Sequence, residues 1–133
     1  MAASHKDLIV WRKTILLITA IYELCRQMPK FEQFGLASQM QRAAVSIAAN
    51  IAEGNGRSSR KEYARFVEIA KGSCSELETL LMVTGNVHDA CRDDALRLQE
   101  TVDEIARMLH ALRHKLIGQT IVGATPHADD PDF

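Results

Sequence analysis

Apolar residues recur at helical spacing through most of this chain and predict four helices. The first helix covers about residues 8–28, with Asp7 as its N-cap and Pro29 as its stop. It carries two neighbouring apolar lines, which are Leu8, Trp11, Ile15, Ile18, Tyr22 and Cys25, and then Thr14, Leu17, Ile21, Leu24 and Met28. Two adjacent lines predict a buried face wider than one partner helix can cover.

The second predicted helix, about residues 36–54, is apolar around most of its circumference. Its polar residues step by three or four and fall within a strip about 80° wide. These residues are Gln39, Arg42, Ser46, Asn50 and Glu53. Such a helix must be covered by other helices, from its own chain or from neighbouring copies. Self-assembly is therefore the first property that the pattern predicts.

Short links join these segments. In the first link, Pro29 to Gly35, we expect Phe31 and Phe34 to fold back onto the core. Glycines 54 and 56 are expected to end the second helix, because glycine tolerates left-handed backbone geometry. Ser59 and Glu62 have the spacing of a capping box that opens the third helix.

The third predicted helix, about residues 60–88, has one core line made of Tyr63, Phe66, Ala70, Ser73 or Cys74, Leu77, Leu81 and Thr84. Gly72, Ser73 and Ser75 weaken it intrinsically, which predicts a close approach of another helix at that level. The fourth, about residues 94–117, is capped by Asp93 or Asp94. Its heptad line is Ala95, Leu98, Val102, Ile105, Leu109, Leu112 and Leu116.

Long helices joined by short links predict an all-α, antiparallel, up-down-up-down four-helix bundle over residues 1–118. Residues 119–133 have no periodicity and contain two prolines and three aspartates, so we expect a disordered acidic tail. No second domain and no internal repeat are evident in the sequence.

Composition narrows the class further. The chain has 133 residues, of which 47% are hydrophobic and 25% charged, as in one globular domain. Its three cysteines are an odd number without CxxC spacing, which indicates a reducing compartment. The apolar run near the N-terminus lacks a cleavage site and is too short to span a bilayer. We therefore expect a cytoplasmic protein with no membrane contact.

Charge is unevenly distributed along the chain. The net charge is −1, but residues 1–65 carry ten Lys or Arg against five Asp or Glu, and residues 66–133 carry six against twelve. The whole chain is not strongly basic, as a dedicated nucleic-acid binder would be. A local basic cluster of Arg57, Arg60, Lys61 and Arg65 keeps that function open.

Residues suited to catalysis do not gather at useful spacing. His110 and His114 are four residues apart, but no carboxylate stands at helical spacing to complete a metal site. Neighbouring carboxylates such as Asp103 and Glu104 point apart on a helix. We therefore expect no enzyme activity, cofactor, bound metal or small-molecule substrate. A metal-dependent enzyme therefore has less support from the sequence than a scaffold or an RNA-binding protein.

The polar strip of the second helix allows two interpretations. It is either a narrow solvent-facing stripe or a polar seam at a helix contact. In a seam, Arg42 would meet Glu76, Glu78 or another subunit, because Glu53 is too far along the same helix. We favour the seam, which would fix register more than it adds stability.

The basic cluster also has two interpretations. Alone, it is a solvated turn with local ion pairs, such as Arg65 with Glu62 or Glu68. In a ring of identical subunits, it would repeat around one rim as a basic collar able to hold a phosphate backbone.

The motifs DLIVW (7–11), FGLASQMQRAAVSIAANIAEG (34–54) and SRKEYARFVEIAKGSCSELET (59–79) carry a family resemblance. The chain resembles the four-helix-bundle proteins related to 23S rRNA intervening sequences, also called S23-type proteins. The same superfamily includes the accessory variability determinant proteins of diversity-generating retroelements. The resemblance implies a homopentameric barrel without enzymatic activity. The retroelement proteins are basic and bind nucleic acid, whereas this chain is nearly neutral.

Two functions follow as hypotheses. The leading one is a non-enzymatic, self-assembling scaffold or adaptor whose partner is a second copy of the chain, with the polar strip and Glu76 at the assembly contact. The alternative is an RNA-binding accessory protein that uses the basic collar.

Overall fold

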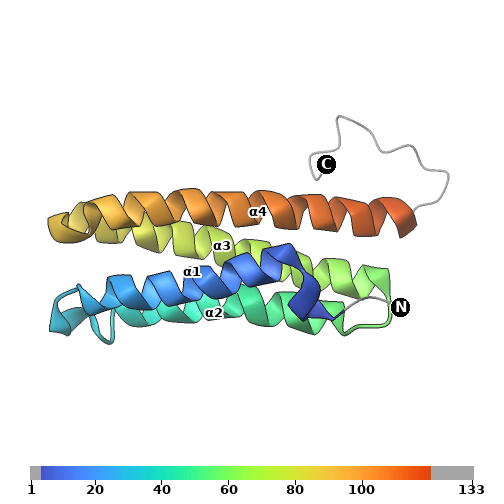
Figure 1. Cartoon of the computed structure of the whole chain (residues 1–133), viewed down its shortest axis with the longest axis horizontal. Coiled ribbons are helices and arrows are strands. Elements are labelled where there is room, and N and C mark those ends of the chain that lie inside the picture. Colours follow the sequence, from blue (N-terminus) through green and yellow to red (C-terminus); the bar gives the residue numbers. More distant parts are fainter. Residues whose placement is uncertain (1–3, 121–133) are drawn as a thin grey trace.

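The computed structural model describes residues 4–120, which form four long helices (Figure 1). These are α1 (Ile9–Arg26), α2 (Leu36–Asn55), α3 (Arg60–Val87) and α4 (Arg92–Thr120). Three short 3-10 turns accompany them, η1 (His5–Asp7), η2 (Lys30–Glu32) and η3 (Asp89–Cys91). Within these residues, no helix is both long enough and apolar enough to cross a membrane. The predicted acidic tail lies almost wholly outside the described residues.

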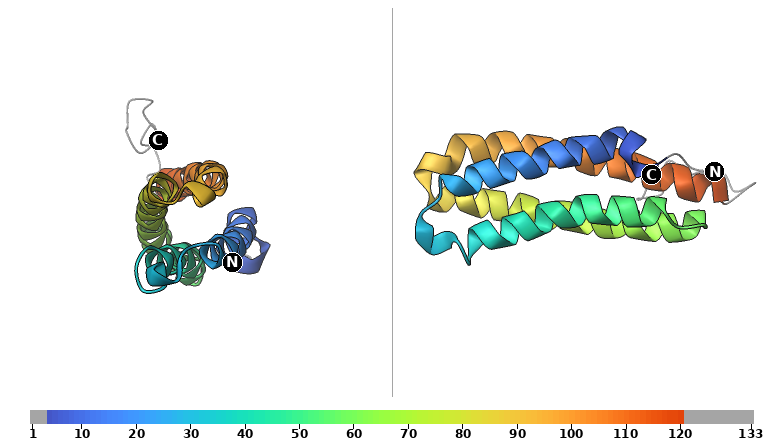
Figure 2. Two further views of the ribbon diagram at one scale, coloured as in Figure 1. Left: turned by 90° about the vertical axis from the view of Figure 1, so that its left-hand side faces the viewer. Right: turned by 60° about the horizontal axis from the view of Figure 1, so that its bottom comes forward.

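Consecutive helices run antiparallel and lie side by side, and α4 returns next to α1 (Figures 1 and 2). Seen along the bundle, the four helices surround one core (Figure 2, left). The predicted all-α class and antiparallel helix order are confirmed. The structure contains one chain, so the expected ring remains a prediction.

The two apolar lines of α1 have different environments. The second line, from Thr14 to Met28, is buried throughout and faces the core. The first line is only partly covered, because Ile15 and Tyr22 remain exposed while Trp11 and Ile18 pack at the edge of the core. The heptad line of α4 is buried except at Leu112, which is half-buried.

Helix α2 is covered mainly by its own chain. Its buried residues are Ala37, Met40, Ala43, Ala44, Ile47, Ala48, Ile51 and Gly54. Of its larger apolar side chains only Val45 is exposed, together with the small Ala49. Of the two predicted sources of cover, helices of its own chain or of neighbouring copies, the first accounts for most of α2. The small alanines let α1 and α3 approach closely enough to cover it.

Two predicted caps are displaced and one is confirmed. Asp7 lies in η1, and Leu8 takes the N-cap position of α1. The compact turn η3 ends at Cys91, so α4 starts earlier than predicted, with Asp93 and Asp94 inside its first turn. Carboxylates in the first turn still stabilise the helix, because they lie at the positive end of its dipole. Ser59 caps α3 as predicted, since its Oγ accepts a hydrogen bond of 3.0 Å from the Glu62 N–H.

The sequence predicts that Gly54 ends the second helix in left-handed geometry, and this prediction is wrong. Gly54 lies inside α2, and the capping Gly56 has an ordinary φ of −83°. A Cβ on Gly54 would lie 2.8 Å from the Phe66 Cβ and 3.0 Å from the Tyr63 Cδ1. Glycine is needed here because α2 and α3 approach within the space of a methyl group.

The expected close approach near Gly72 involves its neighbour instead. Gly72 is exposed, and no atom lies within 4 Å of a Cβ built on it. Ser73 makes the contact, because its Oγ lies 2.8 Å from the Ser46 Oγ of α2. A second close approach, which the sequence analysis does not identify, brings Gly85 against Ala95 of α4, with 3.3 Å between the two Cβ positions.

Phe31 and Phe34 do not fold back onto the core. They are 77% and 88% exposed, so that prediction is wrong. The residue of this link that turns inward is Glu32, whose side chain is only 12% exposed. The carboxylate is drawn in because it finds two hydrogen-bond partners there, described below.

Substituting the two glycines should have opposite effects on stability. Gly54→Ala would force α2 and α3 apart and should lower the free energy of unfolding by about 1–3 kcal/mol. Gly72→Ala should raise it by about 0.5–1 kcal/mol, because the site is open and helical. Urea denaturation of both variants measures this, and equal effects would contradict the packing argument.

Candidate functional site

The middle of the polar strip forms a hydrogen-bonded contact between α2 and α3. The Asn50 amide donates to the Ser46 backbone oxygen at 2.8 Å and to its Oγ at 3.1 Å. The Ser46 Oγ in turn meets the Ser73 Oγ. Ser46 and Asn50 are half-buried. This part of the strip is a polar seam that ties the two helices in one register.

The rest of the strip faces solvent. Arg42 and Glu76 line one shallow recess of about 580 Å³ between α2 and α3, together with Phe34, Ser38, Gln39, Ala43 and Ser46. Arg42 forms no ion pair with any residue that the structure describes. Glu53 pairs with Arg57 at the end of α2. Both interpretations of the strip therefore hold in part, and a role in assembly stays a prediction.

Local ion pairs engage half of the basic cluster. Arg57 pairs with Glu53, and Arg65 lies 3.4 Å from Glu62. Both guanidinium groups also stack on the Phe66 ring, at 4.8 Å and 4.6 Å from its centre. Arg60 and Lys61 are exposed and form no ion pair within residues 4–120. The cluster is thus partly neutralised, and its aromatic ring is already covered by two cations.

The antiparallel fold concentrates charge beyond this cluster. We define the basic end as residues 4–17, 46–73 and 106–120, which lie on one side of the helix midpoints. It carries eleven Lys or Arg against four Asp or Glu, a net charge of +7. The acidic end, residues 18–45 and 74–105, carries five against ten, a net charge of −5. The near-neutral total hides this polarity.

Residues 106–120 of α4 contribute +3 to the basic end, and residues 4–17 contribute +2. In α4, Arg113 and Lys115 lie near its end, beside the start of α3 that bears Arg60 and Lys61, and Arg107 lies just past its midpoint (Figure 1). Arg113 Nε lies 2.9 Å from Glu68 Oε1, which ties the two helices together. This grouping is absent from the predictions made from the sequence. Summing the charges of each half-helix, with successive helices running in opposite directions, would have revealed it.

A hydrogen-bonded pair of side chains locks the acidic end. Glu32 Oε2 lies 2.7 Å from His88 Nε2, and Glu32 Oε1 accepts a hydrogen bond of 3.3 Å from the Leu36 N–H. One carboxylate thus caps α2 and joins the α1–α2 link to the end of α3. The hydrogen bond from His88 is the main cause that lowers the pKa of Glu32.

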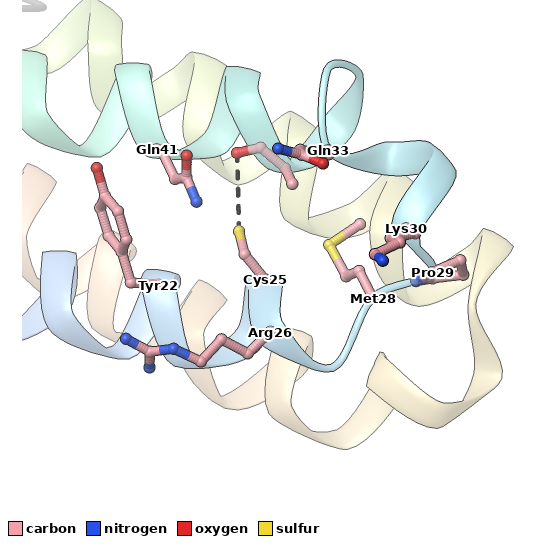
Figure 3. Close-up of a pocket in the computed structure, with 9 residues that line it drawn as sticks. Tyr22, Cys25, Arg26, Met28, Pro29, Lys30, Gln33 and Gln41 are labelled. Atoms are coloured by element: carbon pink, nitrogen blue, oxygen red, sulfur yellow. Dashed lines mark hydrogen bonds between the residues drawn. The ribbon is translucent and has the colours of Figure 1, made fainter.

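A recess of about 410 Å³ lies where α1 meets the α1–α2 link (Figure 3). Its wall includes Tyr22, Gln33, Gln41 and Cys25, whose thiol donates a weak hydrogen bond of 3.7 Å to the Ala37 carbonyl. Burial raises the pKa of the Cys25 thiol. Burial likewise raises the pKa of Cys74 to about 12 and that of Cys91. These environments do not activate a thiolate nucleophile.

The histidine pair of α4 takes part in surface contacts. His110 Nδ1 lies 3.3 Å from the Lys71 ammonium nitrogen on α3. Among the described residues, no three His, Cys, Asp or Glu side chains lie close enough to hold a metal ion. The expectations of no metal and no catalysis stay predictions.

The fold and these contacts define a class, the antiparallel four-helix-bundle proteins with long helices and short links. A profile described as 23S rRNA-intervening sequence protein matches residues 6–111 of this chain. The chain therefore belongs to the 23S rRNA-intervening sequence protein family. Comparison with curated proteins returns no match.

A solved structure supports the same fold. It is the crystal structure of a protein with unknown function from the S23 ribosomal protein family of Bacteroides thetaiotaomicron. The two chains are 22% identical with a TM-score of 0.70, over 79% of this chain and 98% of the other. The predicted family is confirmed by these comparisons. The link to retroelement proteins rests on sequence resemblance alone.

The hydrogen bonds of the Glu32 carboxylate to His88 and to the Leu36 N–H, together called the Glu32 clamp, should make stability depend on pH. Because the folded-state pKa is lowered, the stabilisation is complete above the ordinary glutamate pKa and is lost as pH falls through the folded value. Glu32→Gln should therefore destabilise the protein near neutral pH, and its difference from wild type should shrink in acid. Urea denaturation over this range measures it. Glu23→Gln, which breaks an exposed pair with Arg26, is the control and should show a smaller difference.

Proposed function

We propose that this protein is a non-enzymatic scaffold or adaptor that assembles from identical copies through α1. The supporting observation is apolar surface that the chain itself leaves uncovered. Ile9 and Leu16 are 64% and 70% exposed, although both are large aliphatic residues within a regular helix. Arg12 and Lys13 lie between them on the same face, and exposed apolar residues surrounded by polar ones in this way are candidates for a protein contact.

The exposed residues of α1 form two lines along the helix. Ile9 and Leu16 are seven residues apart and so share one face, and Ile15 and Tyr22 share another. The buried core line lies between them, so α1 offers apolar surface on both flanks. A helix with two such flanks suits a contact in which α1 of one copy inserts beside a neighbour.

In such a contact, two different surfaces of identical subunits meet. Repeated contacts of this kind form a closed ring when the rotation between neighbouring subunits divides a full turn. The family resemblance implies five copies in such a ring. In a parallel ring, all basic ends would lie on one side and form the collar described above.

The double variant Ile9→Glu, Leu16→Glu tests the assembly. Wild-type protein should elute with the mass of a pentamer in size-exclusion chromatography with light scattering. The variant should shift to monomer while keeping its helical circular dichroism, because both residues lie outside the core. Leu96→Glu on α4, which removes a similarly exposed leucine, should leave the assembly intact. A wild-type monomer at all concentrations would refute the proposal.

Nucleic-acid binding is a second candidate, favoured by the net charge of +7 at the basic end. Arg60 and Lys61 are exposed there and form no ion pair within residues 4–120, and α4 adds the exposed Lys115. No exposed aromatic side chain stands free beside the described part of the cluster, so binding would follow the phosphate backbone rather than base sequence.

Salt-dependent binding of a fluorescent poly(U) oligonucleotide tests this candidate. The logarithm of affinity should fall linearly with the logarithm of salt concentration, by about 0.7 per phosphate contact. Arg57→Glu, Arg60→Glu, Lys61→Glu together should abolish binding. The control Arg26→Glu, Arg92→Glu, Arg97→Glu makes the same charge change at the acidic end and should retain it. An equal loss of oligonucleotide binding in both variants would show that binding depends on the net charge of the protein and not on the basic end.

A further inference from the structure

Two phenylalanines project from the acidic end on a rigid link. Phe31 and Phe34 are the most exposed large apolar residues described in this chain. The Glu32 clamp and backbone hydrogen bonds hold the link, including 3.0 Å from Gln33 N to Lys30 O and 2.9 Å from Gly35 N to Glu32 O. The backbone that carries the rings is therefore held in place, so little backbone conformational entropy would be lost if they were bound.

The basic end carries a recess of complementary character. A hollow of about 510 Å³ opens between the start of α3 and the last turns of α4. Ala64, Ile117 and the aliphatic stems of Lys61, Arg65 and Arg113 line it, with Glu62 and Glu68 at its edge. Its wall is mostly carbon, and its three cations outnumber its two carboxylates, an environment that suits an aromatic ring.

We propose that the phenylalanine pair of one copy docks into this recess of a second copy, so that molecules associate end to end. The aromatic rings would lose their solvent exposure, and Lys61, which forms no ion pair within the described residues, would face the rings. The end charges of −5 and +7 attract in this orientation and repel in the two like-end orientations. The end charges and the apolar character of the recess therefore both favour a second copy of this chain as the partner.

This contact is separate from the α1 assembly proposed above. It uses the two ends of the bundle rather than the flanks of α1, so either contact can form without the other. An end-to-end contact that does not close continues into a stack. Its small area predicts weak, concentration-dependent and salt-sensitive association.

Photo-crosslinking locates the contact directly. The full chain carrying p-benzoylphenylalanine at position 34 is mixed in light and heavy isotope forms, irradiated and mapped by mass spectrometry. We expect mixed-isotope crosslinks from position 34 to peptides containing Ala64 or Ile117. Their yield should fall about tenfold or more between about 0.05 M and 0.5 M salt. The Ile9→Glu, Leu16→Glu background should retain them, which separates this contact from α1 assembly.

Complementary variants supply a second test. Phe31→Ser, Phe34→Ser removes the docking residues, and Lys61→Glu, Arg65→Glu reverses charge at the recess. In the Ile9→Glu, Leu16→Glu background, neither variant alone should form higher species in sedimentation velocity. A mixture of the two should form a dimer and no larger stack, because only one functional pair of ends remains. Leu96→Ser is the control for loss of exposed apolar surface and should still stack.

Several outcomes would overturn the proposal. Crosslinks confined to the same chain, or directed to α1 of a neighbour, would show that the phenylalanines have another partner. The absence of any mixed-isotope crosslink at low salt would show that position 34 does not contact a second copy. Higher species that survive both end variants would also refute it.

Discussion

The close approach of α2 and α3 sets the register of this bundle. Gly54 lets the backbone of α2 meet Tyr63 and Phe66, and the Ser46–Ser73 hydrogen bond holds the same two helices about 12 Å further along α2. Sliding one helix past the other would break the hydrogen bond and drive a side chain into the position of the missing Cβ. Packed interiors resist such shifts because they contain little free volume.

That register decides where charge gathers. With α2 and α3 aligned, the start of α3 lies beside the end of α2, and α4 brings its final cations to the same end. Local ion pairs such as Arg57 with Glu53 reduce the field without removing it, because exposed pairs are weak and screened. The result is a near-neutral molecule with strongly unlike ends. Charge-steered association depends on such local fields more than on the total.

Apolar surface is divided in a similar way. Alanine-rich α2 is covered by neighbours within the chain, whereas α1 and the α1–α2 link expose aliphatic and aromatic residues. The difference arises from side-chain size and position. Small residues allow close packing on both sides of α2, while Leu16 and Phe34 lie where no element of the described chain can reach them. The surface left over lies on a flank and at one end.

The amino-acid sequence by itself determined the helix count, the antiparallel order and most core lines, because the period of 3.6 residues and the punctuating prolines and glycines are local signals. It also identified the strip residues and the basic cluster around Arg60. Only the tertiary structure decided that Ser46 and Asn50 are bonded while Arg42 is not. It also decided that Glu32 rather than Phe31 turns inward, and that α4 completes a basic end. Those outcomes depend on contacts between residues far apart in the chain. Which side chain is buried or bonded is decided by the free energy of those contacts, and a local sequence pattern does not contain that information.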